Sequence, residues 1–448
     1  MTSLHRALFA AILLGNAVAF AGVDPVSRLV TAGAVLVLVW DLRRLPDLPR
    51  SVRVAAWVFA GLAVLQLVPL PASLRHVVEP GFADVMPAGW APISLAPWAT
   101  VQVVASTVIA AGIALSAARM AATRSGLPTL LGILAVTCGL LAALGLAGES
   151  GAPGKVLLVR ENTAGGGCYG PFVNSNHFAA AMELSLPAAL VLFAAAVRNL
   201  KRPGASRQRA AVTALACGVI VVVGVAAMLR SSSRGGVLFL TLGLAFSLPF
   251  WLRPSRARRW PWVAALSVLL AVACAMAWTR LPELRDDFRQ LLVVEGVEGN
   301  TRWDLWAATV DSFKRSPFVG SGLGSYRYVI GLDKPATGTF VLEQAHNDWL
   351  EWASTAGLVG LVALALMVAG VISELGPWRV RKLRFELRYP LAGTVAVVAA
   401  TALHETVGFG LQTPLNRYLL AAWLGLLWGV VPRKVKRKTA GVEHDAGE

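Results

Sequence analysis

Long runs of apolar residues, separated by short polar breaks, recur along the whole chain. Each run is close to the roughly 20 residues that an α-helix needs to cross a bilayer. The pattern predicts twelve membrane-spanning helices, near residues 7–22, 26–41, 54–70, 99–118, 127–147, 173–197, 210–229, 235–252, 261–279, 348–373, 390–410 and 417–432. The expected fold is therefore an all-α integral membrane protein, with residues 1–448 forming one membrane domain.

Composition and charge agree with this expectation. Hydrophobic residues make up 56% of the chain and charged residues only 15%, against roughly 25% charged in a soluble domain, which excludes a soluble enzyme. The net charge of +16 would suggest nucleic-acid binding on a soluble face. Here, however, 26 of the 41 Lys and Arg residues fall in segments that are cytoplasmic if the N-terminus is inside. The positive-inside rule therefore explains the charge, both termini are expected in the cytoplasm, and no nucleic-acid partner is expected.

The first apolar run has a second interpretation. Residues 1–6 are basic and Ala19-Phe20-Ala21 resembles a signal-peptidase site, so cleavage would leave eleven spans in the same orientation. The four cysteines show no spacing typical of a disulfide framework or a metal site. We therefore expect no bound metal and no cofactor.

Most unusual polar residues lie in segments expected on the outer side of the membrane. The longest of these, residues 280–347, is expected to be a periplasmic loop with helices lying on the membrane surface; residues 433–448 are expected to form a basic, then polar, cytoplasmic tail. In the loop, Asn300 or Thr301 can cap a helix whose apolar residues recur at helical spacing, namely Trp303, Trp306, Val310 and Phe313.

Three glycines follow that helix, at Gly320, Gly322 and Gly324. A phosphate-binding loop would need a strand before the glycines and a helix directly after them. The pattern lacks that setting, so it favours a tight turn that lets backbone segments approach closely.

His346 and Asn347 come directly before the tenth expected span. An imidazole at the water boundary can accept a proton from a hydroxyl group. The competing interpretation is that His346 or Asn347 only caps the helix.

Two further groups of polar residues are expected at the same surface. Arg230 and Arg234 flank a serine turn between two spans, where arginine can bind phosphate oxygens in a bidentate manner or extend to lipid headgroups. The sixth span opens with Asn174-Ser175-Asn176-His177 and places Glu183 on the same helix face as Asn176. A carboxylate at that depth is expected to face a polar cavity or to pair with an arginine.

Taken in this order, the motifs resemble the bacterial O-antigen ligase and O-antigen polymerase superfamily. The matching pieces lie clearest in residues 160–362: Asn174 to Ala179, Ser233-Arg234-Gly235, Arg302 with Trp306 and the glycine turn, and His346-Asn347 followed by Leu350, Gly357 and Gly360. Glu183 and His404-Glu405 match no part of the family pattern.

The resemblance implies the membrane architecture of the glycosyltransferase C (GT-C) fold class, with a large helical extracytoplasmic loop. It implies a glycan donor linked to undecaprenyl diphosphate, and as acceptor lipid A core, a lipid-linked repeat or another glycan, at the outer face of the bacterial inner membrane. Arg234 and Arg302 would stabilise the diphosphate and His346 would act as base. The residues expected to contact substrate are Arg230, Arg160, Asn176, His177 and Asn347. The reaction would be metal-independent and inverting.

Ligases and polymerases share these motifs, and we favour a ligase with a polymerase as the alternative. A proton-coupled transporter is the alternative of another class. It predicts ionisable residues along a path across the membrane, and many transporters also carry internal repeats. A non-catalytic membrane protein of envelope assembly is a further alternative, against which the two arginines and the histidine argue.

Overall fold

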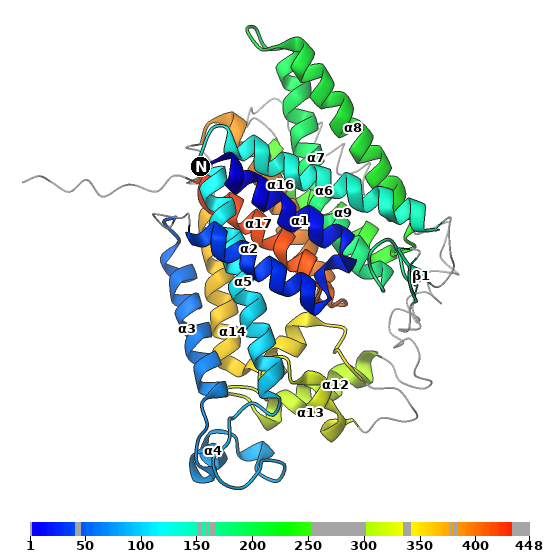
Figure 1. Cartoon of the computed structure of the whole chain (residues 1–448). Coiled ribbons are helices and arrows are strands. Elements are labelled where there is room, and N and C mark those ends of the chain that lie inside the picture. Colours follow the sequence, from blue (N-terminus) through cyan, green and yellow to red (C-terminus); the bar gives the residue numbers. More distant parts are fainter. Residues whose placement is uncertain are drawn as a thin grey trace, which may run out of the picture.

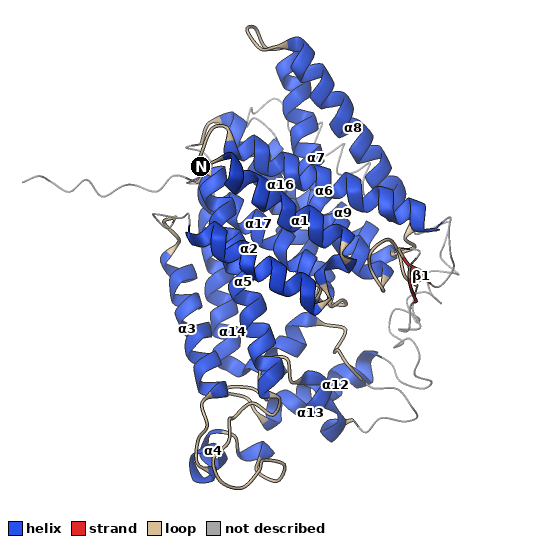
Figure 2. Cartoon of the chain, viewed as in Figure 1, coloured by secondary structure: helices blue, strands red, loops and turns tan. Residues whose placement is uncertain are grey.

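The computed structural model describes residues 2–40, 46–149, 155–157, 159–161, 167–251, 302–334, 342–376, 379 and 383–431. These residues form an all-α bundle with one short β-hairpin (Figures 1 and 2). The ninth expected span, the proposed cap at Asn300 or Thr301 and the basic tail lie outside the described residues.

The helices follow one another in the order of the predicted spans. They are α1 (Ser3–Val18), η1 (Phe20–Gly22), α2 (Pro25–Trp40), α3 (Arg50–Leu67), α4 (Ala72–Val78), η2 (Pro80–Phe82), α5 (Pro97–Ala121), α6 (Gly126–Glu149), α7 (Ser175–Leu200), α8 (Arg207–Arg230), α9 (Arg234–Trp251), α12 (Arg302–Arg315), α13 (Tyr326–Asp333), α14 (Asp348–Leu375), η4 (Phe385–Leu387), α16 (Arg388–His404), η5 (Gly410–Gln412) and α17 (Pro414–Val430). Strands β1 (Lys155–Val156) and β2 (Arg160–Glu161) pair antiparallel.

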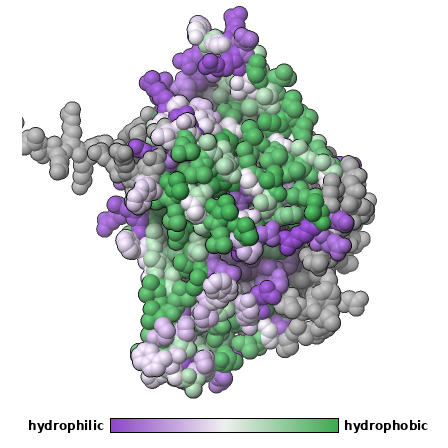
Figure 3. All heavy atoms as spheres, in the orientation of Figure 1, coloured by the Kyte–Doolittle hydropathy of each residue, from purple (hydrophilic) through white to green (hydrophobic). Residues whose placement is uncertain are grey.

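Seven of these helices are long and apolar enough to cross a membrane: α3, α5, α6, α7, α8, α9 and α14. Each predicted span within the described residues is occupied by a helix, which confirms an all-α membrane protein; the count of twelve stays a prediction. Hydrophobic side chains cover the middle of the molecular surface, and hydrophilic ones gather at the tip between α7 and α8 (Figure 3). The chain is therefore a multi-pass membrane protein.

One predicted span is shorter than its apolar run. The run at 390–410 continues to Gly410, but α16 ends at His404 because the chain turns at Glu405 and folds back. The nine residues from Glu405 to Thr413, called the α16–α17 turn below, carry much of the candidate site.

The centre of the bundle is formed by α17, packed between α5 and α7. Gly425 and Gly429 of α17 lie against the backbone oxygens of Ala114 and Ala118 in α5, where a Cβ atom would collide. On the other side, Trp423 donates its indole N–H to the Leu184 carbonyl of α7 at 2.7 Å. These contacts hold α17 against both α5 and α7.

The short helices α4, α12 and α13 cover the end of the bundle opposite the α7–α8 tip and are called the cap below (Figure 1). Gly320, Gly322 and Gly324 all have positive φ, and a Cβ at Gly320 would collide with the backbone of α14 at Thr355. Gln66 of α3 donates to the Val319 and Thr355 carbonyls and accepts from the Leu323 amide. The predicted tight turn with close backbone approach is therefore confirmed.

Glu79 is a buried carboxyl group in this cap, 1% exposed. Burial raises its pKa from the ordinary 4.5 to about 7, against the smaller effects of hydrogen bonds from Ser316 and Val319. Because the folded-state pKa is the higher one, its contribution to stability is full below pH 4.5 and is lost as pH rises through 7. We expect Glu79→Gln to raise the apparent melting temperature at pH 8 by a few degrees and to change it little at pH 5, as measured in detergent by thermal unfolding; an equal shift at both pH values would contradict this.

Candidate active site

The polar residues singled out from the sequence gather around the α16–α17 turn, at the bundle end that faces α12. The turn is held from three directions. Arg302 of α12 and the amide of Asp348 at the start of α14 donate hydrogen bonds to its carbonyls, and Thr413 shares a hydrogen bond with His177 of α7. Segments more than 200 residues apart in the sequence are thus neighbours in space.

His346 lies directly before α14 in a left-handed conformation, with φ of 50°. The helix cap is supplied by Asn347, whose side-chain oxygen accepts from the amides of Trp349 and Leu350 at 3.1 Å each. The amide of Asp348 donates to the Glu405 and Gly408 carbonyls. Asn347 therefore caps α14, and the imidazole of His346 takes no part in capping.

The environment of that imidazole favours its neutral form. Burial, and to a smaller extent the positive charge of Arg302, lower the pKa of His346 from its ordinary 6.5 to about 4. The ring contacts Phe409 edge-on, with centroids 4.7 Å apart. At neutral pH the group is uncharged and can accept a proton.

Arg302 is the first residue of α12 and is only 8% exposed. One of its terminal nitrogens donates to the Val407 carbonyl at 2.6 Å. Four residues on, Trp306 donates its indole N–H to the Ala345 carbonyl at 3.0 Å. These two bonds hold the start of α12 against the α16–α17 turn and against the residue preceding His346.

The serine turn between α8 and α9 joins the same region through α7. Ser233 donates its hydroxyl to the Asn176 side-chain oxygen at 2.7 Å. Arg234 begins α9 and is exposed, as is Arg230 at the end of α8. Asn176 therefore positions the turn that carries Arg234.

His177 also contacts Phe409, as His346 does. Its Nδ1 lies 3.0 Å from the Thr413 hydroxyl, and its ring meets Phe409 edge-on at 4.5 Å. Asn416 of α17 donates to the His177 carbonyl at 3.0 Å. Phe409 thus contacts two imidazoles that the sequence places 169 positions apart.

Five helices begin around this region: α7, α9, α12, α14 and α17. A helix N-terminus presents unpaired N–H groups and a partial positive charge. With Arg302 and Arg234 at two of these N-termini, the arrangement favours an anion with several oxygens, such as a phosphate or diphosphate.

Arg160 is held elsewhere. It pairs with Asp24 at 3.1 Å and lies over the Phe20 ring at 5.6 Å, so the contacts seen tie the β-hairpin to the turn between α1 and α2. Its expected role in substrate binding stays a prediction.

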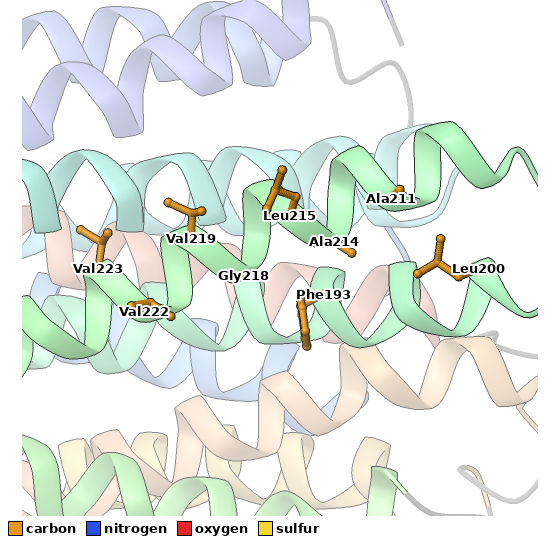
Figure 4. Close-up of a pocket in the computed structure, with 9 residues that line it drawn as sticks. All are labelled: Phe193, Leu200, Ala211, Ala214, Leu215, Gly218, Val219, Val222 and Val223. Atoms are coloured by element: carbon orange, nitrogen blue, oxygen red, sulfur yellow. The ribbon is translucent and has the colours of Figure 1, made fainter.

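An apolar groove of about 600 Å³ lies between α7 and α8, away from the polar residues. Side chains from both helices line it, among them Phe193, Leu200, Leu215 and Val223 (Figure 4). Its lining is apolar and offers no side chain that could bind a sugar or a phosphate.

The sequence did not identify three features of the site. Phe409 and the Val407 carbonyl carry no local signal. Glu183, by contrast, could have been paired with His404, because a carboxylate inside a span requires a partner; the structure joins them at 2.8 Å. Among the described residues no three His, Cys, Asp or Glu side chains are arranged to hold a metal ion.

No curated protein matches the chain. Residues 219–365 match the family model described as O-Antigen ligase. The matched segment runs from the outer half of α8 into α14 and contains Arg234, Arg302 and His346. This match confirms the resemblance to the O-antigen ligase and polymerase superfamily over residues 219–365; the motif from Asn174 to Ala179 lies outside the matched residues.

Proposed function

We propose that this protein is an O-antigen ligase-type glycosyltransferase that moves a glycan from undecaprenyl diphosphate to an acceptor hydroxyl at the periplasmic face of the inner membrane. The observation that carries the proposal is the gathering of Arg302, His346 and the Ser233-Arg234-Gly235 turn around one turn of backbone. The family match supports a glycan transferase of this class.

The donor half of the site needs positive charge. A diphosphate is already a good leaving group, and its departure is favoured by fixed cations and N–H groups rather than by a protonating acid. Arg234 and Arg302 supply the cations, with Arg230 nearby on α8. The five helix N-termini add a field of the same sign.

The acceptor half needs a base. The acceptor oxygen attacks the anomeric carbon and the bond from that carbon to the diphosphate oxygen breaks, with its electron pair leaving on the diphosphate. The neutral imidazole of His346 takes the acceptor proton. Attack from the side opposite the diphosphate inverts the anomeric centre, and the step as written needs no metal ion.

The acceptor class is the finer part of the proposal. A ligase uses lipid A core or another glycan, and a polymerase uses a second lipid-linked repeat; we favour the ligase. A transporter is disfavoured because Glu183, a carboxyl group buried within α7, is paired with His404 instead of lining a path.

The test is transfer in sealed vesicles that contain the purified protein. A glycan on a polyprenyl diphosphate and a core oligosaccharide lipid are supplied from outside, to vesicles in which the outer face of the protein points either outward or inward. We expect transfer only in the first set, measured by the mass of the glycosylated acceptor.

Each result decides one part of the proposal. Transfer to lipid-linked repeats but not to core lipid would make the protein a polymerase. Transfer only in the inward-facing vesicles would overturn the periplasmic location. No transfer to any acceptor, together with no binding of a polyprenyl diphosphate, would reject the proposed function.

A further inference from the structure

A buried carboxylate and imidazole form a pair under the start of α9. Glu183 Oε1 of α7 lies 2.8 Å from His404 Nδ1 at the end of α16, and the two residues are 1% and 5% exposed. Burying two ionisable groups is costly unless each satisfies the other. The pair is absent from the catalytic steps described above, so its role requires another explanation.

The orientation of the imidazole is fixed on both sides. Phe239 of α9 stacks on the ring, with centroids 5.1 Å apart and planes 30° apart. When Nδ1 donates its proton to Glu183, Nε2 carries the lone pair. The Nε2 atom lies 3.6 Å from the position that a Cβ atom would take on Gly235. The ring therefore lies directly beside the residue that follows Arg234.

His404 is also the last residue of α16, directly before the α16–α17 turn. The Gly408 backbone folds over the His404 ring, where a Cβ atom would come within 3.2 Å of its Cδ2 atom. One residue before Gly408, the Val407 carbonyl accepts the hydrogen bond from Arg302. His404 thus separates the first turn of α9, which carries Arg234, from the turn that anchors Arg302.

We infer that Glu183 and His404 are positioning residues that set the spacing between Arg234 and Arg302, and that this spacing gives the site its preference for a diphosphate over a monophosphate. The inference rests on the proposed function. Two arginines at a fixed separation can each bind one phosphate group of a diphosphate, whereas a monophosphate occupies only one of them.

The decisive variant replaces both groups with apolar residues of similar size, as Glu183→Leu with His404→Phe. Such replacement of a buried ion pair is often neutral for folding, and the new phenyl ring can still stack on Phe239. Binding of farnesyl diphosphate and farnesyl phosphate is measured by calorimetry in detergent. We expect the wild type to prefer the diphosphate by about tenfold or more, and the double variant to lose most of that preference at an unchanged melting temperature.

Two further variants separate positioning from general stability. Glu183→Gln keeps an oxygen that accepts from Nδ1, so it should retain the preference. Asn16→Leu with Thr31→Val removes another buried hydrogen-bonded pair, which joins α1 to α2 at 2.9 Å, and should leave the preference unchanged. If the double variant at Glu183 and His404 does not fold, Phe239→Leu loosens the ring alone and should weaken the preference about threefold.

The outcomes distinguish the inference from the proposed function. If the wild type binds neither lipid phosphate, the donor assignment itself fails. If the wild type prefers the diphosphate and the double variant keeps that preference, only the inference fails. An undiminished preference in Phe239→Leu, or a lost one in Glu183→Gln, also overturns it.

Discussion

Replacing Arg302 with lysine is expected to lower glycan transfer by roughly 10²-fold, the effect typical of losing one fixed electrostatic group in an active site. Lysine keeps the charge but has no planar fork, so it cannot hold the Val407 carbonyl and a phosphate oxygen at once. In the structure, one terminal nitrogen of Arg302 already donates a hydrogen bond to the Val407 carbonyl at 2.6 Å. Initial rates with a polyprenyl diphosphate donor, at saturating acceptor, measure the loss.

Arg315→Lys is the matched control for this change. Arg315 ends the same helix and pairs with Asp333 at 2.7 Å, an interaction that lysine can also make. We expect transfer within about twofold of wild type, because Arg315 lies at the opposite end of α12 from Arg302. Equal losses in the two variants would mean that α12 is only destabilised, and near-normal transfer in Arg302→Lys would remove Arg302 from the chemistry.

The fold could be predicted from the sequence because the bilayer imposes a length on each apolar run. Helix ends were less predictable. The run at 390–410 is apolar to its end, yet α16 stops at His404, where Glu405 turns inward and accepts the Gly410 amide at 2.8 Å. Burial raises the pKa of Glu405 well above its ordinary value, with the Asp348 carboxyl adding to the effect. No local sequence pattern predicts that this carboxyl group is buried, because the groups that stabilise it there belong to α14 and η5.

Individual residues of the site could be predicted because their motifs are local, but their arrangement could not. Ser233 and Arg234 are adjacent in the sequence, and so are His346 and Asn347. Phe409, which contacts both histidines, belongs to an apolar run that is predicted from the sequence to be a membrane span. Its contacts with His177 and His346 follow only from the way α16 and α17 pack between α7 and α14.

The division of work between His346 and Asn347 also required the structure. From spacing alone, either residue could cap α14. The backbone resolves the question, because Asn347 has the extended conformation of a cap residue and both cap hydrogen bonds, while His346 has positive φ. A side chain that is half-buried at a helix start without capping it has another use.

Replacing His346 with asparagine is expected to lower transfer by about 10²- to 10⁴-fold, the usual contribution of a general base. Asparagine adopts positive φ more readily than most residues, so the backbone at this position should not be strained. Burial and Arg302 lower the pKa of His346 to about 4, so the base form is present above that pH and is lost below it. In the wild type, kcat/KM should therefore be level from pH 5.5 to 8.5 and fall as pH drops through 4.

His76→Asn is the matched control, because His76 is an exposed histidine on α4, in the cap and far along the chain from the site. It should transfer normally, while His346→Asn should still bind polyprenyl diphosphate, since Arg234 and Arg302 are untouched. Transfer by His346→Asn within a few-fold of wild type, with the same fall near pH 4, would assign the base elsewhere. His177 would then be the next residue to replace, because its ring also contacts Phe409, with centroids 4.5 Å apart.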